Sequence, residues 1–218
     1  MRDCCGTYGD TASGQFGAAV ARRDLDAYRR RGPDRVTRLM RDAVIGAAGD
    51  SRPATVLDIG GGIGALSLEL IAAGVGQATV VDASRPYLEA ARAEARRTGR
   101  EDRLTIVPGD FVELAPTLAA ADVVAMNRVV CCYPDVRGLL DTALARCGRV
   151  FAFSYPKRRW YIRAVAALGN GVRGLTGRPF RTFVHDERAM RAVAAAGGFR
   201  PQGRRETFVW RVEVWTRA

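Results

Sequence analysis

One stretch of the chain decides its fold: Val56-Leu-Asp-Ile-Gly-Gly-Gly-Ile-Gly64. An apolar run enters closely spaced glycines, and a helix is predicted directly afterwards over 63–73. Glycines are needed where a turn is tight and where a ligand lies against bare backbone. The helix N-terminus beyond them presents unpaired N–H groups. Because Gly60, Gly62 and Ala65 also satisfy the dinucleotide fingerprint, the stretch alone leaves the ligand class open.

Around this stretch, short apolar strands alternate with helices. The strands are predicted over 54–59, 78–81, 104–107, 123–126 and 150–154, and the helices between or after them over 63–73, 86–97, 136–145 and 186–196. Such alternation predicts an α/β fold with a parallel, doubly wound sheet. Two further strands, over 199–205 and 208–216, end the chain and are predicted to form an antiparallel hairpin at one sheet edge.

The N-terminal part has a different pattern. Residues 1–14 are small and polar, and helices are predicted over 16–30 and 34–48, separated by Gly32-Pro33. We therefore divide the chain into an N-terminal arm and helical cap at 1–50 and a Rossmann-like domain at 51–218. A basic insertion at about 157–181 interrupts the second part.

The bulk composition excludes several classes of protein. The chain has 218 residues, 48% hydrophobic and 26% charged, which suits a globular fold and disfavours disorder. We find no apolar run of about 18 residues that would span a membrane, and no secretory signal, so the expected location is the cytoplasm. Five cysteines, an odd number, argue against a disulfide framework.

The net charge of +11 invites a nucleic-acid interpretation, because a positive surface attracts polyanions. Among the 34 basic residues, however, Lys157 is the sole lysine, a skew typical of a GC-rich genome. No appended RNA-binding module is visible. Nucleic-acid binding is therefore disfavoured as the main role, and methylation of RNA is kept as an alternative.

Three acidic residues narrow the ligand class. Asp58 precedes the first glycine, Asp82 ends the next strand, and Asp110 follows the third strand before Phe111. A carboxylate at Asp58 would repel a pyrophosphate but can bind an ammonium group. Carboxylates at neighbouring strand tips can accept hydrogen bonds from ribose hydroxyls and from an adenine amino group. Acidic groups at three adjacent tips suit a cationic nucleoside.

The chain resembles the class I S-adenosylmethionine-dependent methyltransferases from about Ala54 to its C-terminus. The resemblance implies a seven-stranded sheet whose last strand is antiparallel, with S-adenosyl-L-methionine as the cofactor and S-adenosyl-L-homocysteine as the product. It implies that Asp58 and the glycines bind the methionine end, Asp82 the ribose, and Asp110 with Phe111 the adenine. The cofactor-binding residues it implies are Asp58, Gly60, Gly61, Gly62, Gly64, Asp82, Ala83, Asp110, Phe111, Asn127, Arg128 and Val129, the last three beside the methyl group.

A narrower resemblance follows further along the chain. The segments 149–161, 181–185 and 197–199, with the pair Tyr133-Pro134, are similar to magnesium protoporphyrin IX methyltransferases, which esterify a propionate. Where that family has a histidine before Tyr-Pro, this chain has Cys132. A porphyrin substrate therefore does not follow from the resemblance.

Candidate residues at the substrate end are fewer and weaker. Cys132, Tyr133 and the single histidine, His185, are the candidate catalytic residues. Seven basic residues lie between Lys157 and Arg181 without an acid among them. They form either a solvated helix face or a lid whose arginines bind carboxylate or phosphate. The candidate substrate-binding residues are Tyr28, Arg158, Trp160, Tyr161 and Arg181.

The expected activity is methylation of a small molecule, with an oxygen of an anionic or aromatic metabolite as the acceptor. A second hypothesis is a soft thiol or arsenic centre held by Cys4, Cys5, Cys131 and Cys132, although a standard metal site is not expected. A third is a non-catalytic cofactor-binding subunit. The partner is a small-molecule substrate, and the oligomeric state stays open.

Overall fold

The structure is a computed structural model, and it describes residues 14–218. Its helices are α2 (Ala18–Arg31), α3 (Arg35–Ala48), α4 (Ala65–Ala72), α5 (Arg85–Arg97), α6 (Phe111–Leu114), α7 (Val136–Ala145), α8 (Trp160–Leu175) and α9 (Glu187–Ala196). Its strands are β1 (Thr55–Ile59), β2 (Gln77–Asp82), β3 (Leu104–Pro108), β4 (Ala121–Met126), β5 (Cys147–Pro156), β6 (Phe199–Glu206) and β7 (Trp210–Arg217). Short 3-10 turns are η1 (Glu101–Arg103), η2 (Ala115–Thr117) and η3 (Val130–Cys132).

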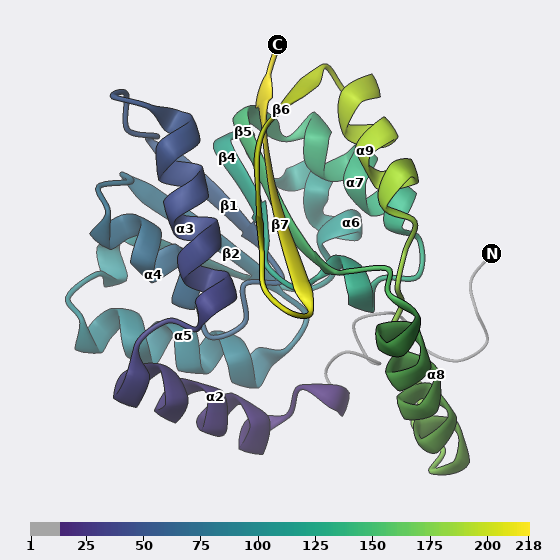
Figure 1. Ribbon diagram of the computed structural model, residues 1–218. Helices are drawn as coiled ribbons and strands as arrows, with labels where there is room; N and C mark the ends of the chain where they lie inside the picture. The colour runs from purple at the N-terminus through teal and green to yellow at the C-terminus, as the bar shows by residue number, and fades with distance from the viewer. Residues whose placement is uncertain (1–13) are drawn as a thin grey trace.

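Within the described residues one seven-stranded sheet runs in the order β3-β2-β1-β4-β5-β7-β6. The pairs among β1 to β5 are parallel, whereas β7 pairs antiparallel with both β5 and β6 (Figure 1). The predicted doubly wound α/β fold with an antiparallel last strand is therefore confirmed. The strand β1 is followed in the sheet by β2 and β3 on one side, and β4 is followed by β5 on the other. A crevice therefore opens at the carboxyl ends of β1 and β4.

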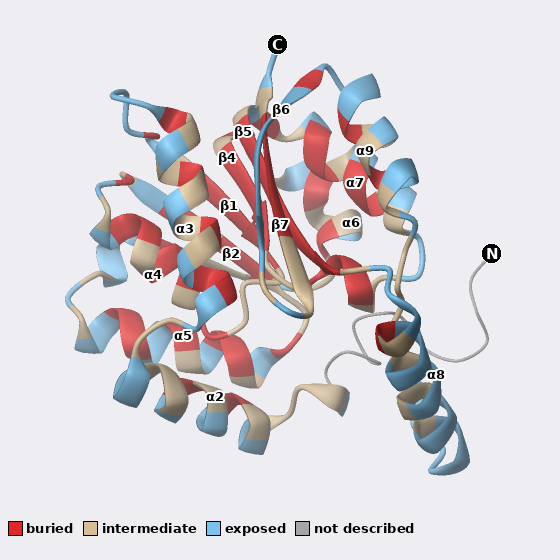
Figure 2. Ribbon diagram, viewed as in Figure 1, coloured by how far each residue is buried: buried red, intermediate tan, exposed pale blue. Residues whose placement is uncertain are grey.

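The alternation of side chains along β5, an inner strand of the sheet, explains how the helices are distributed on its two faces. Phe151, Phe153 and Tyr155 point to one face and pack with α7 and α9, whereas Val150 and Ala152 point to the other. Side chains alternate across a strand, so large residues fill one side and small ones leave room on the other. Helix α3 lies on the small-residue side, against β5 and β7 (Figures 1 and 2).

Helix α3 shares the core of the sheet. Its Val36, Met40 and Val44 are buried in one cluster with residues of β1, β2, β4 and β5. Asp34 caps the helix, because its side chain accepts hydrogen bonds from the backbone N–H groups of Val36 and Thr37. Residues 35–48 are thus packed into the body of the fold, and the proposed boundary at residue 50 separates segments that are buried together.

Helix α2 is attached to the body through a small apolar cluster, in which Ala21 and Leu25 pack on Ile63 and Tyr87, and through polar contacts. The Tyr28 hydroxyl donates to Glu69 Oε1 of α4 at 3.0 Å, and the Tyr87 hydroxyl donates to Asp24 Oδ2 at 2.7 Å. Arg29 pairs with the buried Glu94 of α5 at 2.8 Å. Hydrogen bonds from Arg97 and Arg29 lower the pKa of the Glu94 carboxyl. These contacts fix the α2 helix beneath α5 (Figure 1).

The start of helix α4 and the form of the segment after β5 differ from the sequence-based expectation. Helix α4 begins at Ala65 and not at residue 63, because Gly64 has a φ of +73° in the left-handed region. The basic segment after β5 forms one continuous helix, α8, despite three glycines within it. Among the described helices, none is long and apolar enough to cross a membrane.

The packing of α3 makes a testable prediction. We expect Met40→Ala to lower the free energy of unfolding of the whole domain by about 2–5 kcal/mol, because Met40 is fully buried against the sheet. Urea denaturation followed by circular dichroism measures this. The matched control Asp42→Ala, on the exposed side of the same helix, should change it by less than about 0.5 kcal/mol. An unshifted main transition for Met40→Ala would mean that α3 folds as a separate cap.

Candidate active site

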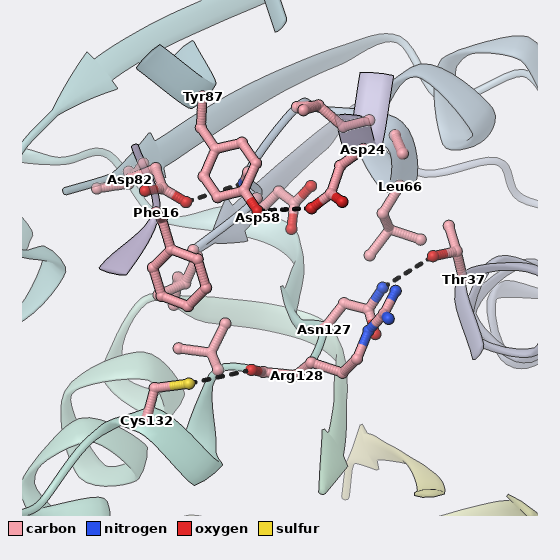
Figure 3. A pocket seen from close by; sticks show the side chains of 18 of the residues that line it. Phe16, Asp24, Thr37, Asp58, Leu66, Asp82, Tyr87, Asn127, Arg128 and Cys132 are labelled. Carbon is pink, nitrogen blue, oxygen red and sulfur yellow. Dashed lines mark hydrogen bonds between the residues drawn. The ribbon is translucent and has the colours of Figure 1, made fainter. Parts of the chain in front are cut away.

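A cavity of about 790 Å³ opens at the carboxyl ends of the parallel strands. Its walls are the β1–α4 glycine loop, the ends of β2, β3 and β4, and the N-terminal helices α2 and α3 with the turn between them (Figure 3). The volume lies within the range of about 300–1,000 Å³ that is usual for small-molecule sites. It is the place that the topology of the sheet predicts for a ligand.

The glycine loop brings backbone close to the cavity. Gly60 and Gly62 have φ values of +62° and +57°, which favour glycine strongly. A Cβ on Gly60 would lie 2.5 Å from Val129 Cγ2, so the β1 loop and the β4 loop touch without room for a side chain. A Cβ on Gly62, by contrast, would meet nothing within 4 Å. The loop therefore leaves open space over Gly62, where a ligand can lie.

Asp58 is the most unusual group of the cavity. Its carboxylate is completely buried at the end of β1; Oδ2 accepts a hydrogen bond from the Ser67 hydroxyl at 2.7 Å, while Oδ1 has no hydrogen-bond partner among the described residues. Burial, reinforced by repulsion from Asp82, raises the pKa of the Asp58 carboxyl to about 7. An unsatisfied buried acceptor is costly, so a donor from a bound ligand, above all a cationic one, would be stabilised there.

Asp82 is held by backbone on both sides. Its Oδ2 accepts from the Gly62 N–H at 2.9 Å and its Oδ1 accepts from the Ser84 N–H at 2.8 Å. Burial raises the pKa of this carboxyl. Each oxygen keeps a further lone pair for a ligand hydroxyl, so Asp82, beside Ala83 in the wall, can accept from a ribose.

Asp110 meets a partner that the sequence did not indicate. Its Oδ1 accepts from the Val112 N–H at 2.9 Å, which caps α6, and the Tyr133 hydroxyl donates to its Oδ2 at 3.1 Å. Burial raises the pKa of the Asp110 carboxyl. Phe111 is buried next to it and also lines the cavity. Tyr133, which follows η3, thus links the loop after β4 to the β3 side of the cavity.

The residues after β4 belong to a hydrogen-bonded chain that crosses three elements. The Arg128 N–H donates to Ser154 Oγ at 2.8 Å, and the Ser154 hydroxyl donates to Asn127 Oδ1 at 3.0 Å. Asn127 Nδ2 in turn donates to Thr37 Oγ1 at 3.0 Å (Figure 3). Thr37 and the Arg128 guanidinium both donate to Asp34. Arg128 is the one described non-glycine residue with a positive φ, +64°. This network holds a strained backbone at the cavity wall.

The candidate catalytic residues occupy different environments. Cys132 and Tyr133 line the cavity, whereas His185 lies outside it and its Nε2 is 3.0 Å from the Tyr133 carbonyl oxygen. Burial lowers the pKa of the His185 imidazole. This position lets His185 orient the Tyr133 loop rather than contact a ligand. Cys131 and Cys132 have their Sγ atoms 3.6 Å apart.

The structure separates the candidate substrate-binding residues. Tyr28 lines the cavity, and the other four do not. Arg158 pairs with Asp186, Trp160 is exposed, Tyr161 stacks on Phe208, and Arg181 donates to the carbonyls of Arg178 and Phe180.

The basic segment therefore does not form the described wall of the cavity. Cys4 and Cys5 lie outside the described residues. Within residues 14–218 no group of three or more histidine, cysteine or acidic side chains is placed to hold a metal ion.

Sequence reasoning missed the wall formed by the N-terminal helices. Phe16 packs on Tyr87, with the ring centroids 5.7 Å apart, and both line the cavity near Asp82 (Figure 3). Arg31 and Arg38, at the turn between α2 and α3, complete this side. The available signal was the Gly32-Pro33-Asp34 break, which fixes a sharp turn between the two helices but does not say where it packs.

Comparison with known proteins agrees with this geometry. Residues 56–152 match the family model described as a methyltransferase domain. The chain is similar to the crystal structure of magnesium protoporphyrin IX methyltransferase from Synechocystis PCC 6803 with bound S-adenosylmethionine, with a TM-score of 0.74 and 18% identity, covering 99% of this chain and 100% of that one. No curated protein sequence matches the chain significantly.

Two other solved structures bear on the choice of acceptor. The mitomycin 7-O-methyltransferase structure has a TM-score of 0.61 and 25% identity, and the match covers 96% of this chain and 61% of that one. The complex of a Haloferax volcanii methyltransferase with the Trm112 methyltransferase activator has a TM-score of 0.69 and 16% identity, covering 94% and 96%. The domain match over residues 56–152 and the fold that the chain shares with these solved structures support a methyltransferase that uses S-adenosylmethionine.

The burial of Asp58 makes the second prediction. We expect the affinity for S-adenosylhomocysteine to increase between about pH 5.5 and about pH 8, because the deprotonated carboxylate attracts the ligand ammonium. Near the raised pKa, binding should release protons, since the ammonium favours the ionised form. Titration calorimetry in buffers with different ionisation enthalpies measures both effects.

Substitution of Asp58 tests the assignment directly. Asp58→Asn should abolish the pH dependence and the proton release. Asp122→Asn is the matched control, because Asp122 accepts hydrogen bonds from the Ala54 and Thr55 N–H groups at the other end of β1 and does not line the cavity. A flat affinity profile for the unmodified protein would contradict the role given to Asp58.

Proposed function

We propose that this methyltransferase transfers a methyl group from S-adenosylmethionine to an oxygen of a small anionic acceptor, most simply a carboxylate. The observation that carries this proposal is the composition of the cavity wall. The cavity runs from carboxylates at the strand ends to a wall on the N-terminal helices, where Arg23, Arg31 and Arg38 outnumber Asp24 and Asp34. A cationic cofactor at one end and an anionic acceptor at the other would match this change of sign.

We assign the carboxylate half of the cavity to the cofactor. The unsatisfied Oδ1 of Asp58 fits the ammonium of the methionine moiety, and the open space over Gly62 fits its chain. Asp82 would accept from the ribose hydroxyls, and Asp110 with Phe111 would hold the adenine. When bound, the cofactor supplies an electrophilic methyl group on a positively charged sulfur.

The arginine half is assigned to the acceptor. Arg23, Arg31, Arg38 and Arg128 line this wall. Arg23 pairs with Asp24 and Arg128 with Asp34, whereas Arg31 and Arg38 have no acidic partner among the described residues. Arg38 donates to the Pro33 carbonyl and keeps further N–H groups, and guanidinium groups that no carboxylate neutralises bind carboxylates through paired hydrogen bonds. These two arginines are the residues we expect to bind the acceptor anion.

The chemistry of an anionic acceptor suits a site without a histidine. Methyl transfer is an in-line displacement, so the protein has to align the acceptor oxygen with the methyl group and exclude water. A carboxylate is already the nucleophile at neutral pH and needs no general base. The described wall of the cavity contains no histidine, and the Tyr87 and Tyr133 hydroxyls donate to Asp24 and Asp110.

The segment after β4 would control this alignment. Asn127, Arg128 and Val129 border both halves of the cavity, and the hydrogen bonds to Ser154 and Thr37 fix their backbone. A fixed boundary between cofactor and acceptor is what an in-line reaction requires. Cys132 would lie beside the same boundary as a small packing residue.

The three alternative hypotheses have weaker support than methylation of a small anionic acceptor. RNA methylation is favoured by the likeness to a methyltransferase solved with its activator protein and by the net charge of +11. A soft centre would require Cys4 and Cys5 to join Cys131 and Cys132. In a non-catalytic subunit the cavity would have no space for an acceptor. Here the arginine half leaves space for one.

The proposal is tested by incubating the protein with a metabolite extract and methyl-labelled cofactor. We expect the label to enter compounds that lose one negative charge on methylation and therefore elute earlier from an anion exchanger. A carboxylate acceptor gives an ester, which mild alkali cleaves, whereas a phenolate gives a stable ether. Label found only in RNA, with binding that falls steeply as salt rises, would replace this proposal by the RNA alternative.

A second test addresses the two arginines. We expect Arg31→Ala combined with Arg38→Ala to raise the KM for the acceptor by about tenfold to a hundredfold, the effect of losing one or two charge-assisted hydrogen bonds. Cofactor affinity should not change. The control Arg35→Ala removes an exposed arginine of α3 that does not line the cavity, and it should leave both constants unchanged.

A further inference from the structure

Helix α8 carries a row of large apolar side chains that no described residue covers. Val165, Leu168, Val172 and Leu175 are 70%, 71%, 54% and 91% exposed. At the base of the helix, Trp160 is 80% exposed, and Phe208 of the β6–β7 turn is 75% exposed and stacks on Tyr161. We call the α8 surface the set formed by Trp160, Tyr161, Val165, Leu168, Val172, Leu175 and Phe208.

The spacing of these residues makes one continuous stripe. From Tyr161 to Leu175 the steps are four, three, four and three residues, which keeps the side chains on one side of a helix. A neighbouring side attaches the helix to the protein through the buried Ile162 and through Arg173, which donates to Asn170, Phe180 and Thr182. The stripe is therefore a separate face, not the inner face of the helix.

These exposed side chains include all the large hydrophobic residues that are exposed in the described part of the chain. Helix α8 also stands away from the body, with its far end pale blue in Figure 2. Large apolar side chains gathered in one place, and not scattered, mark an interaction surface. Within residues 14–218 the stripe thus forms an exposed ridge along α8.

The charge around the ridge has one sign. Residues 157–185 contain no aspartate or glutamate. Arg159, Arg163 and Arg178 are exposed, and their side chains form no hydrogen bond or ion pair with described residues. The partner must therefore be apolar at its centre and negative around it.

We propose that α8 docks this methyltransferase onto an anionic lipid bilayer surface, with the apolar stripe in the acyl boundary and the arginines at the headgroups. A helix with tryptophan and leucine on one face and arginines outside it is typical of helices that lie in the membrane interface. Arginine side chains reach the headgroups while their stems stay apolar. With 16 residues, α8 is too short to span a bilayer and suits lying along it.

Two other partners fit these observations less well. A second copy of the chain could cover the stripe but would leave Arg159, Arg163 and Arg178 without anionic partners. RNA would satisfy the arginines but would leave Val165, Leu168 and Leu175 uncovered, since aliphatic side chains gain little from a polyanion. A bilayer with acidic lipids satisfies both the charge and the apolar stripe.

Docking through α8 would also orient the active site. The segment after α8 returns to the cavity: Phe180 packs edge-on against Phe16, with centroids 5.4 Å apart, and the Phe183 N–H donates to the Cys131 carbonyl at 2.7 Å. The bilayer would therefore lie close to the residues that line the cavity mouth. An acceptor dissolved in the membrane would reach the site without crossing water.

The test is flotation of the purified protein with lipid vesicles, and it needs no methyl acceptor. We expect binding to vesicles of equal parts phosphatidylcholine and phosphatidylglycerol, at least about tenfold tighter than to phosphatidylcholine alone, and weakened by added salt. Equal binding to both vesicle types, or to neither, would overturn the proposal.

Two variants separate the apolar and the basic contributions. Leu168→Glu with Leu175→Glu should lower binding by at least about tenfold, whereas Ala119→Glu with Ala120→Glu, exposed residues before β4, adds the same charge and should lower it far less. Serine at Arg159, Arg163 and Arg178 should weaken binding, and serine at Arg22, Arg35 and Arg92, also exposed, is the matched control. If either α8 variant binds like its control, the proposal is wrong.

Two further measurements complete the test. Light scattering should give the same mass for the unmodified protein and for the variant with glutamate at positions 168 and 175. A dimer that this variant converts to a monomer would identify α8 as a contact between copies and overturn the proposal. Unchanged affinity for S-adenosylhomocysteine shows that the variants are folded, because α8 does not line the cavity.

Discussion

The site depends on one constraint: carboxylates that are buried at the ends of parallel strands must find hydrogen-bond donors. Asp82 finds them in the backbone N–H groups of Gly62 and Ser84, which ties β2 to the glycine loop of β1. Asp58 finds only Ser67, and its second oxygen stays without a described partner. A buried carboxylate in this state either keeps a proton, as its raised pKa of about 7 indicates, or is neutralised by a cation. The fold thus places an unsatisfied acceptor at the point where we propose that the cofactor brings its ammonium group.

The N-terminal helices form the second wall of the cavity. Helix α3 packs on the side of the sheet where β5 has small residues, and this position brings Thr37 and Asp34 to the end of β4. Helix α2 is attached by Tyr28, Arg29 and the Asp24–Tyr87 hydrogen bond, so its arginines are presented at the mouth. The wall that we propose for the acceptor is therefore formed by a segment that precedes the methyltransferase domain match in the chain.

The basic segment after β5 has a different place from the one that its sequence suggests. Its arginines were expected to cover the cavity, yet within the described residues its polar groups either bond to each other or face outward, and its aliphatic residues face solvent. What comes near the cavity from this region is the return segment, whose Phe180 contacts Phe16 and whose His185 contacts the Tyr133 carbonyl. Helix α8 thus lies beside the site without forming its wall, which is consistent with a role in placing the enzyme and not in binding the acceptor.

The sequence by itself determined the order of strands and helices, the glycine turn and the three acidic strand ends, because each of these is a local pattern read within about ten residues. It also indicated the antiparallel edge, through the alternation in the last strand. Only the tertiary structure decided which arginines face the cavity, since Asn127 meets Thr37 and Tyr87 meets Asp24 across 90 and 63 residues of chain. The partner of Asp110, Tyr133, was likewise fixed by packing between β3 and the loop after β4. Local pattern fixes which groups stand at the end of each strand, whereas the contacts between distant segments, which no periodicity encodes, decide what those groups face.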